Sequence, residues 1–215
     1  MRNDMKPGVV KTGKPDSLLL TRRAFGAGLA AGTGFLAFAH PVRALTVDQA
    51  RALIDQAISE VNAIINSGRS ETQMYGDFER IFATYADVAA IARSSLGTAA
   101  KTASAAQIAD FTKAYQGYIS RKYGRRFREF IGGKIEVIDA KPYKSYYEVI
   151  STATLQGQAP FDLRWWVGDK SGRQLFFNII IEGVNMLASE RTEVGSLLDA
   201  NGGDVSRLTA VLKTL

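Results

Sequence analysis

The sequence contains no cysteine and only one histidine, His40. The lack of cysteine excludes disulfide bonds, thiol nucleophiles and cysteine-ligated metal sites. His40 lies in an N-terminal segment that is unlike the rest of the chain. Residues 45–215 therefore contain neither cysteine nor histidine. This excludes Ser-His-Asp and Cys-His catalysis and histidine-ligated metals in that part. We therefore assign no catalytic residue and no metal ligand, and an enzyme would have to rely on carboxylates, lysine or tyrosine.

A hydrophobic run long enough to span a membrane is also missing. The apolar stretch at 26–38 is short and rich in glycine, whereas a transmembrane helix needs about 20 apolar residues. It follows Arg22-Arg23 and precedes Val42-Arg43-Ala44, which is the layout of a cleavable export signal. The paired arginines resemble a twin-arginine signal. The sequence thus predicts a signal peptide over 1–44, cleaved after Ala44, and export to the periplasm, with a retained membrane anchor as the alternative.

The excess of positive charge belongs mostly to this N-terminal segment. The whole chain has a formal net charge of +6. Residues 1–44 hold seven of the 27 basic side chains and two of the 21 acidic ones, which leaves 20 and 19 in residues 45–215. A net charge of +1 gives little electrostatic attraction for a nucleic acid. We expect no nucleic-acid partner.

Capping patterns and apolar spacing predict several helices. Thr46 with Gln49, and Ser104 with Gln107, form capping boxes ahead of helices at about 47–66 and 105–131. Asp87 is a candidate cap for a short helix that ends at Leu96-Gly97. Further helices are expected at about 71–84, 188–200 and 204–214.

Between these helices the residue composition changes to one that is typical of strands. The segments 134–140, 145–156, 161–168 and 173–184 are rich in β-branched and aromatic residues, and Asp169-Lys170-Ser171-Gly172 has the composition of a hairpin turn. Leu163, Trp165 and Val167 alternate with polar neighbours, so one face of the sheet is apolar. The order predicts an α+β domain over 45–215, in which helices pack on one face of a four-stranded antiparallel sheet.

Three segments together carry a family resemblance. FFNIIIEGVNMLASERTEV at 176–194, FATYADVAAIARSSLG at 82–97 and AAQIADFTKAYQGYISRKYG at 105–124 resemble the MlaC family, also called the toluene-tolerance auxiliary family. The resemblance covers about residues 70–215. The chain departs from the usual family pattern at Asn178, where the family has aspartate, at Asn185, where it has serine, and at Glu190, where it has an aromatic residue.

The resemblance implies a carrier and not an enzyme. MlaC-like proteins hold phospholipid acyl chains in an apolar cavity between sheet and helices, so the phospholipid is cargo and no cofactor is expected. The implied partners are an inner-membrane ABC lipid transporter complex and an outer-membrane lipoprotein/porin complex, which together maintain outer-membrane lipid asymmetry. The alternatives are a carrier of another apolar ligand, such as a hopanoid, and a small enzyme based on carboxylates or tyrosine.

The apolar strand faces and the aromatic helix stripe supply the candidate lipid-binding residues. For each of them the alternative is a place in a close-packed core. The candidates are Tyr118, Phe127, Tyr147, Val149, Leu163, Trp165, Val167, Phe177, Ile179, Ile181 and Val184. Arg121, Arg125 and Arg191 are candidates for contact with the lipid headgroup or a partner. For Arg121 and Arg125 the alternative is an ordinary solvated helix face.

Overall fold

The structure is a computed structural model that describes residues 45–215, except for the side chains of 126–128. The predicted signal peptide, with Arg22-Arg23 and the cleavage site after Ala44, lies outside the described residues.

The helices begin where the capping residues predict. α1 (Val47–Ile65) and α4 (Ala105–Gly124) each start with the expected capping box, and Asp87 caps α3 (Val88–Ser95). The remaining helices are α2 (Glu71–Tyr85), α5 (Met186–Ala200) and α6 (Val205–Leu212), with a short 3-10 helix η1 (Gly97–Lys101) after α3.

The long helix expected at 105–131 is shorter than predicted. α4 ends at Gly124 and continues as the 3-10 helix η2 (Arg125–Phe130). The ring of Tyr75 from α2 packs against Gly124 so closely that a Cβ atom there would lie 2.5 Å from it. Glycine is a poor helix former, and here it makes room for the neighbouring helix.

The strands form an antiparallel meander in the order β1-β2-β3-β4-β5. They are β1 (Lys134–Tyr143), β2 (Tyr146–Thr154), β3 (Phe161–Gly168), β4 (Leu175–Ile181) and β5 (Val184–Asn185). The fifth strand exists because the expected strand at 173–184 folds back on itself. Glu182 and Gly183 both have positive φ, 48° and 82°, which suits a two-residue hairpin turn.

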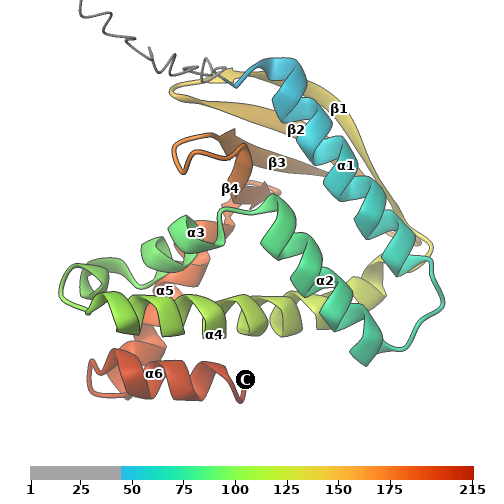
Figure 1. Cartoon of the computed structure of the whole chain (residues 1–215). Coiled ribbons are helices and arrows are strands. Elements are labelled where there is room, and N and C mark those ends of the chain that lie inside the picture. Colours follow the sequence, from blue (N-terminus) through green and yellow to red (C-terminus); the bar gives the residue numbers. More distant parts are fainter. Residues whose placement is uncertain (1–44) are drawn as a thin grey trace, which may run out of the picture. The chain divides into compact units, whose positions relative to one another are not determined.

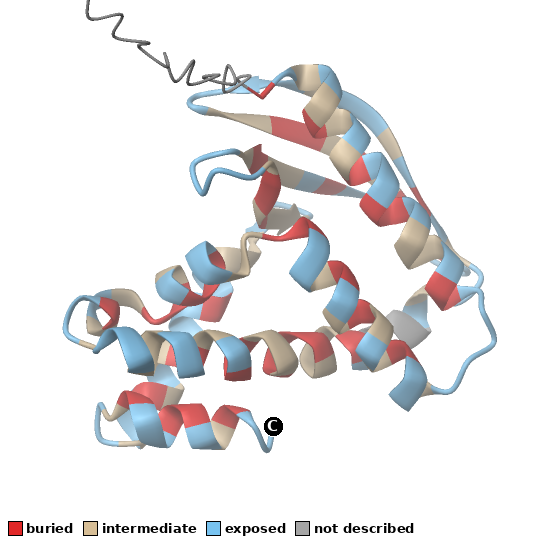
Figure 2. Ribbon diagram, viewed as in Figure 1, coloured by how far each residue is buried: buried red, intermediate tan, exposed pale blue. Residues whose placement is uncertain are grey.

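Helices cover one face of the sheet, as the alternation predicts. α1 packs across β1 and β2, whereas α3 and α5 contact β4. α4 lies at the centre of the remaining helices and contacts α2, α3 and α6 (Figure 1). Figure 2 shows the buried residues facing inward between these elements. On β3, Leu163 and Val167 are buried, while Asp162 and Arg164 on the other face are exposed.

Candidate functional site

An apolar cavity of about 610 Å³ lies between the sheet and the helices. This volume is in the range of about 300–1,000 Å³ that small-molecule sites occupy. Its wall combines residues of α1 to α5 with residues of β1, β3 and β4. Representative apolar residues from these elements are Ile58, Phe78, Ile91, Ile119, Ile135, Leu163, Ile181 and Leu187.

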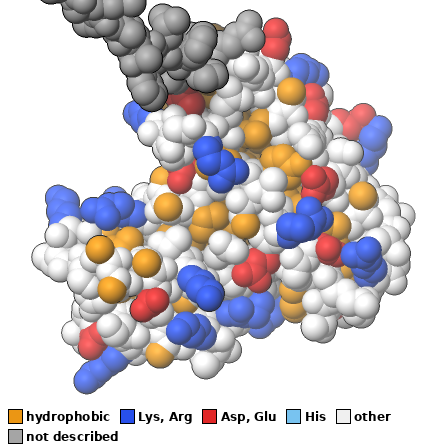
Figure 3. Space-filling model, viewed as in Figure 1, with side chains coloured by type: hydrophobic (Ala, Val, Ile, Leu, Met, Phe, Trp, Pro, Cys, Tyr) orange, Lys and Arg blue, Asp and Glu red, His pale blue; other side chains and the backbone are white. Residues whose placement is uncertain are grey.

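The cavity has an exposed rim and a buried interior. Glu129 on η2, together with Gln158 and Ala159 in the loop between β2 and β3, belongs to the wall and is exposed to solvent. Phe78 and Tyr115, by contrast, are buried deep in the wall. On the face shown in Figure 3, hydrophobic side chains come to the surface between α1 and the region of α3 and α4. The exposed part of the wall therefore lies at η2, at the β2–β3 loop and at Glu182.

Five of the eleven predicted lipid-binding residues lie on the cavity wall. These are Leu163, Trp165, Phe177, Ile179 and Ile181, from the neighbouring strands β3 and β4. The sheet register pairs Leu163 with Ile181 and Trp165 with Ile179, so these four share one face. Trp165 is held in place by a hydrogen bond that its Nε1 donates to Ser151 Oγ, 2.8 Å away.

Three other strand residues, Tyr147, Val149 and Val167, lie outside the cavity, and the start of the domain binds this part of the sheet. The Tyr147 hydroxyl donates to the carbonyl of Leu45 at 2.7 Å, and the Leu45 amide donates to Asp169 at 3.2 Å. Val149 and Val167, which share this end, are fully buried in the core. The alternative of a close-packed core thus applies to these two valines.

The last three predicted lining residues are placed elsewhere. Val184 lies beyond the hairpin turn on β5 and is 54% exposed, because that turn carries it away from the cavity. Tyr118 belongs to α4 and donates its hydroxyl to Glu193 instead of lining the cavity. The side chain of Phe127 lies outside the described part of the chain.

The three candidate arginines do not line the cavity either. Arg121 donates to the carbonyl of Leu212 at 2.8 Å, and Arg125 donates to the carbonyl of Leu215 at 3.0 Å. Both therefore hold carbonyl groups at the end of α6, where a positive charge is favourable. The Arg191 guanidinium lies against Gly97, 3.4 Å from the position of a Cβ atom there.

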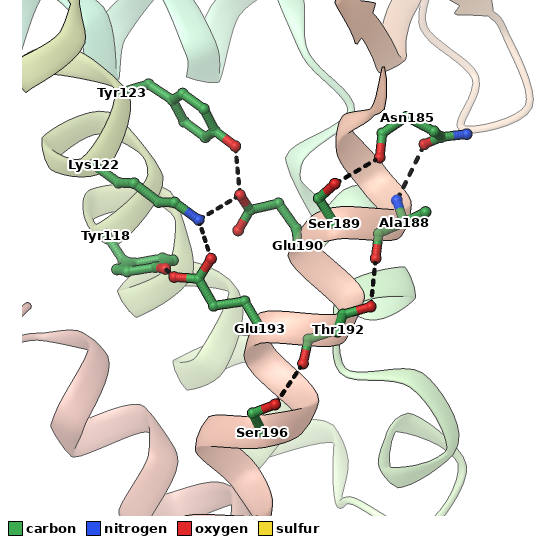
Figure 4. Close-up of polar contacts among 10 residues, drawn as sticks. All are labelled: Tyr118, Lys122, Tyr123, Asn185, Ala188, Ser189, Glu190, Thr192, Glu193 and Ser196. Carbon is green, nitrogen blue, oxygen red and sulfur yellow. Dashed lines mark hydrogen bonds and ion pairs between the residues drawn. The ribbon is translucent and has the colours of Figure 1, made fainter. Parts of the chain in front are cut away.

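A polar cluster between α4 and α5 was not predicted from the sequence. Lys122 forms ion pairs with both Glu190 and Glu193, at 2.7 Å for Glu190, and its ammonium also lies over the rings of Tyr118 and Tyr123 (Figure 4). Tyr123 donates its hydroxyl to the same Glu190 oxygen that Lys122 contacts. The only signal in the sequence is the helical spacing, since Tyr118 and Lys122 share one helix face, as do Glu190 and Glu193.

The cluster shifts the pKa values of its members. Burial, followed by the hydrogen bond to Glu193, raises the pKa of Tyr118. Burial and the hydrogen bond to Glu190 likewise raise the pKa of Tyr123. Burial acts to raise the pKa of Glu193, but hydrogen bonds from Lys122 and Tyr118 lower it overall. At neutral pH the tyrosines are therefore neutral hydrogen-bond donors to the carboxyl groups of Glu193 and Glu190.

The part of the cavity wall next to this cluster is polar. Glu190, Tyr123, Ser120 and Tyr115 all belong to the wall. Burial, and then the negative charge of Glu190, raise the pKa of Tyr115.

Within the described residues, no group of three or more Asp, Glu, His or Cys side chains is arranged to hold a metal ion. Nor does any described helix have the length and apolar character that crossing a bilayer requires.

The fold is an α+β domain with an internal apolar cavity. The sequence model of the MlaC protein family matches residues 55–214, so the chain belongs to the MlaC family. This is a family of lipid-binding carriers and not of enzymes. A similar solved structure is a phospholipid-binding protein from Ralstonia solanacearum in complex with a phospholipid. The two chains are 16% identical with a TM-score of 0.65, over 77% of this chain and 95% of the other, so the likeness shows a shared fold.

Proposed function

We propose that the protein is a periplasmic carrier that holds the acyl chains of a phospholipid in the cavity between its sheet and helices. The observation that carries the proposal is the apolar cavity of about 610 Å³ in a member of the MlaC family. The solved structure of similar fold, which holds a phospholipid, gives further support.

The physical need for such a cavity follows from the cost of exposing acyl chains to water. Two lipid tails contain about 30 methylenes, and each costs about 0.8 kcal/mol in water, so unaided transit faces a barrier on the order of 20 kcal/mol. A wall made of residues such as Phe78, Ile119 and Ile181 replaces the contacts of the bilayer with contacts of similar strength. The tails are then nearly isoenergetic in the protein and in a membrane, so the partners must set the direction of transport.

We further propose an inner-membrane ABC transporter complex and an outer-membrane lipoprotein/porin complex as these partners. This assignment rests on family membership and on the predicted export signal. If Arg22-Arg23 is a twin-arginine signal, replacing both residues with lysine should leave the precursor in the cytoplasm. Cell fractionation tests this expectation, and normal delivery of the variant to the periplasm would favour the general secretion route instead.

The function itself is tested by native mass spectrometry of the protein purified from the periplasm. We expect a mass increment that lipid extraction identifies as phospholipid, at one lipid per chain. The same sample should release no lysolipid or free phosphoryl headgroup as protein concentration rises. Protein that is free of lipid under gentle conditions, and that fails to take up phospholipid from vesicles, would contradict the proposal.

A further inference from the structure

The cavity has a closed end on the side where the domain begins. On β3 the wall includes Trp165, whereas Val167, the next residue on that face, is fully buried outside it. On α1 the wall starts at Ala57, and Ile54, one turn nearer the start of the helix, is also fully buried outside it. Leu45 just before α1 lies at this same end, because it binds the partner of Val167 on β2. Close-packed core therefore lies beyond the cavity here.

Three aromatic side chains of the wall meet at the closed end. The rings of Trp165 and Phe176 pack edge-on, with centroids 5.3 Å apart, and the rings of Phe82 and Phe176 lie 6.4 Å apart. They come from β3, β4 and α2, and all three belong to the cavity wall. We call Phe82, Trp165 and Phe176 the end wall.

Hydrogen bonds hold two members of the end wall in place. The indole Nε1 of Trp165 donates to Ser151 Oγ at 2.8 Å, and Ser151 is itself fully buried. The backbone carbonyl of Phe176 accepts from the amide of Asp87 at 2.8 Å. Turning the indole aside would leave the buried serine hydroxyl without this partner, which costs free energy. The end wall is therefore a fixed stop.

The distance from the rim to the end wall suits an acyl chain. The exposed rim residues Gln158 and Ala159 lie just before β3, and the wall then follows this strand from Phe161 to Trp165. Four residues of a strand cover about 13 Å. One leaflet of a bilayer core is about 15 Å thick, which is half of the whole hydrocarbon layer. A chain of ordinary membrane length that enters at the rim would thus bring its methyl end to the end wall.

We propose that the end wall sets the longest acyl chain that the protein carries, and that Trp165 determines this limit. Trp165 is partly exposed to the cavity, whereas Phe176 is only 6% exposed. A chain that fits keeps all of its methylenes out of water. A longer chain is stopped by the indole, and each methylene left at the rim lowers its affinity about fourfold. This inference rests on the proposed carrier function and specifies its cargo by chain length.

The test measures which chain lengths the protein takes up from a mixture. Delipidated protein is incubated with vesicles of phosphatidylglycerols whose monounsaturated chains lengthen in steps of two methylenes. The bound lipid is then extracted and identified by mass spectrometry. We expect the bound fraction to follow the vesicle composition up to a limiting length and then to fall by roughly tenfold per step.

Variants should move this limit in opposite directions. Trp165→Ala removes the indole and should extend the limit by at least one step. Ile181→Trp should shorten it, because Ile181 pairs with Leu163, between the rim and the end wall. This variant fills open space and leaves Trp165 intact, so it tests the proposal even if Trp165→Ala fails to fold. Trp166→Ala is the matched control, since Trp166 does not line the cavity, and its limit should equal that of the wild type.

The possible failures of the two proposals can be told apart. If the wild type shows no limiting length, or if Ile181→Trp and a folded Trp165→Ala keep the wild-type limit, the end-wall assignment is wrong while the carrier function stands. An equal shift in Trp166→Ala also overturns the assignment, because that residue is outside the cavity. If the wild type takes up no phospholipid of any length, the carrier function itself has failed.

Discussion

At the scale of single residues, the core face of the sheet contains two kinds of apolar position. Val149 on β2 is fully buried and does not border the cavity. Ile181 on β4 is partly exposed because it forms part of the cavity wall. The two side chains point to the same face and differ only in what lies above them. A charge placed at each should therefore have different consequences.

We predict that Ile181→Glu yields a folded, monodisperse protein that no longer co-purifies with lipid. A carboxylate at this position can be hydrated when the cavity empties, but acyl chains cannot solvate it. In the matched variant Val149→Glu, the carboxylate has no such space, and an unpaired buried charge costs several kcal/mol, a large part of the stability of a domain. That variant should unfold or aggregate.

Size-exclusion chromatography, thermal unfolding and lipid extraction of both variants test this pair. If Ile181→Glu fails to fold, the residue belongs to a close-packed core. If it folds and keeps its lipid at the wild-type level, the acyl chains lie elsewhere in the protein.

At the scale of elements, the hairpin that connects β4 to β5 joins two parts of the cavity wall, one on β4 and one on α5. Glu182 and Gly183 form a turn with two positive φ angles, which only glycine adopts without strain. This turn carries Val184 away from the cavity and leads the chain into α5, which contributes Glu190.

We predict that Gly183→Ala lowers the free energy of unfolding by about 1–2 kcal/mol, because alanine is strained at positive φ. No atom lies within 4 Å of the added methyl group, so the effect is due to the backbone alone. Gly195 in α5 is the matched control, since its methyl position is equally open but its backbone is helical. Gly195→Ala should raise stability by about 0.5–1 kcal/mol. Urea unfolding measures both, and a gain at Gly183 would contradict the turn geometry.

Elements with local signals could be predicted from the sequence. The capping boxes at Thr46 and Ser104 mark the starts of α1 and α4, and the Asp169–Gly172 turn joins β3 to β4. These features depend on residues a few positions apart. The turn at Glu182-Gly183 was missed because apolar residues flank it on both sides, so the segment has the composition of one continuous strand.

The cavity wall could be predicted only in part, because alternation identifies a face and not what packs on it. Val149 and Ile181 have the same pattern, and they differ in what lies above them: α1 packs on β2, whereas Ile181 borders the cavity. The start of the domain also binds this part of the sheet, through Leu45 and Tyr147, which are 102 residues apart in the sequence. The polar cluster likewise joins Lys122 to Glu190 across 68 residues. Local spacing can place residues on one helix face, but it does not show which distant residues that face contacts.

At the scale of the whole molecule, the two tryptophans lie on opposite faces of the sheet. Trp165 is part of the cavity wall and packs edge-on against Phe176, with ring centroids 5.3 Å apart. Trp166, the next residue on β3, packs with Tyr143 and Tyr146 on the other face of the sheet. Adjacent residues of a strand point to opposite faces, so the chain carries one fluorescent probe on each.

This arrangement allows the most direct test of whether acyl chains occupy the cavity. Two single-tryptophan variants, Trp166→Phe and Trp165→Phe, are loaded with a phospholipid whose acyl chains carry bromine, which quenches tryptophan fluorescence only at near contact. We predict strong quenching when Trp165 is the remaining tryptophan and almost none when Trp166 remains. Equal quenching in both variants, or quenching of Trp166 alone, would contradict the account by placing the lipid outside the cavity between the sheet and the helices.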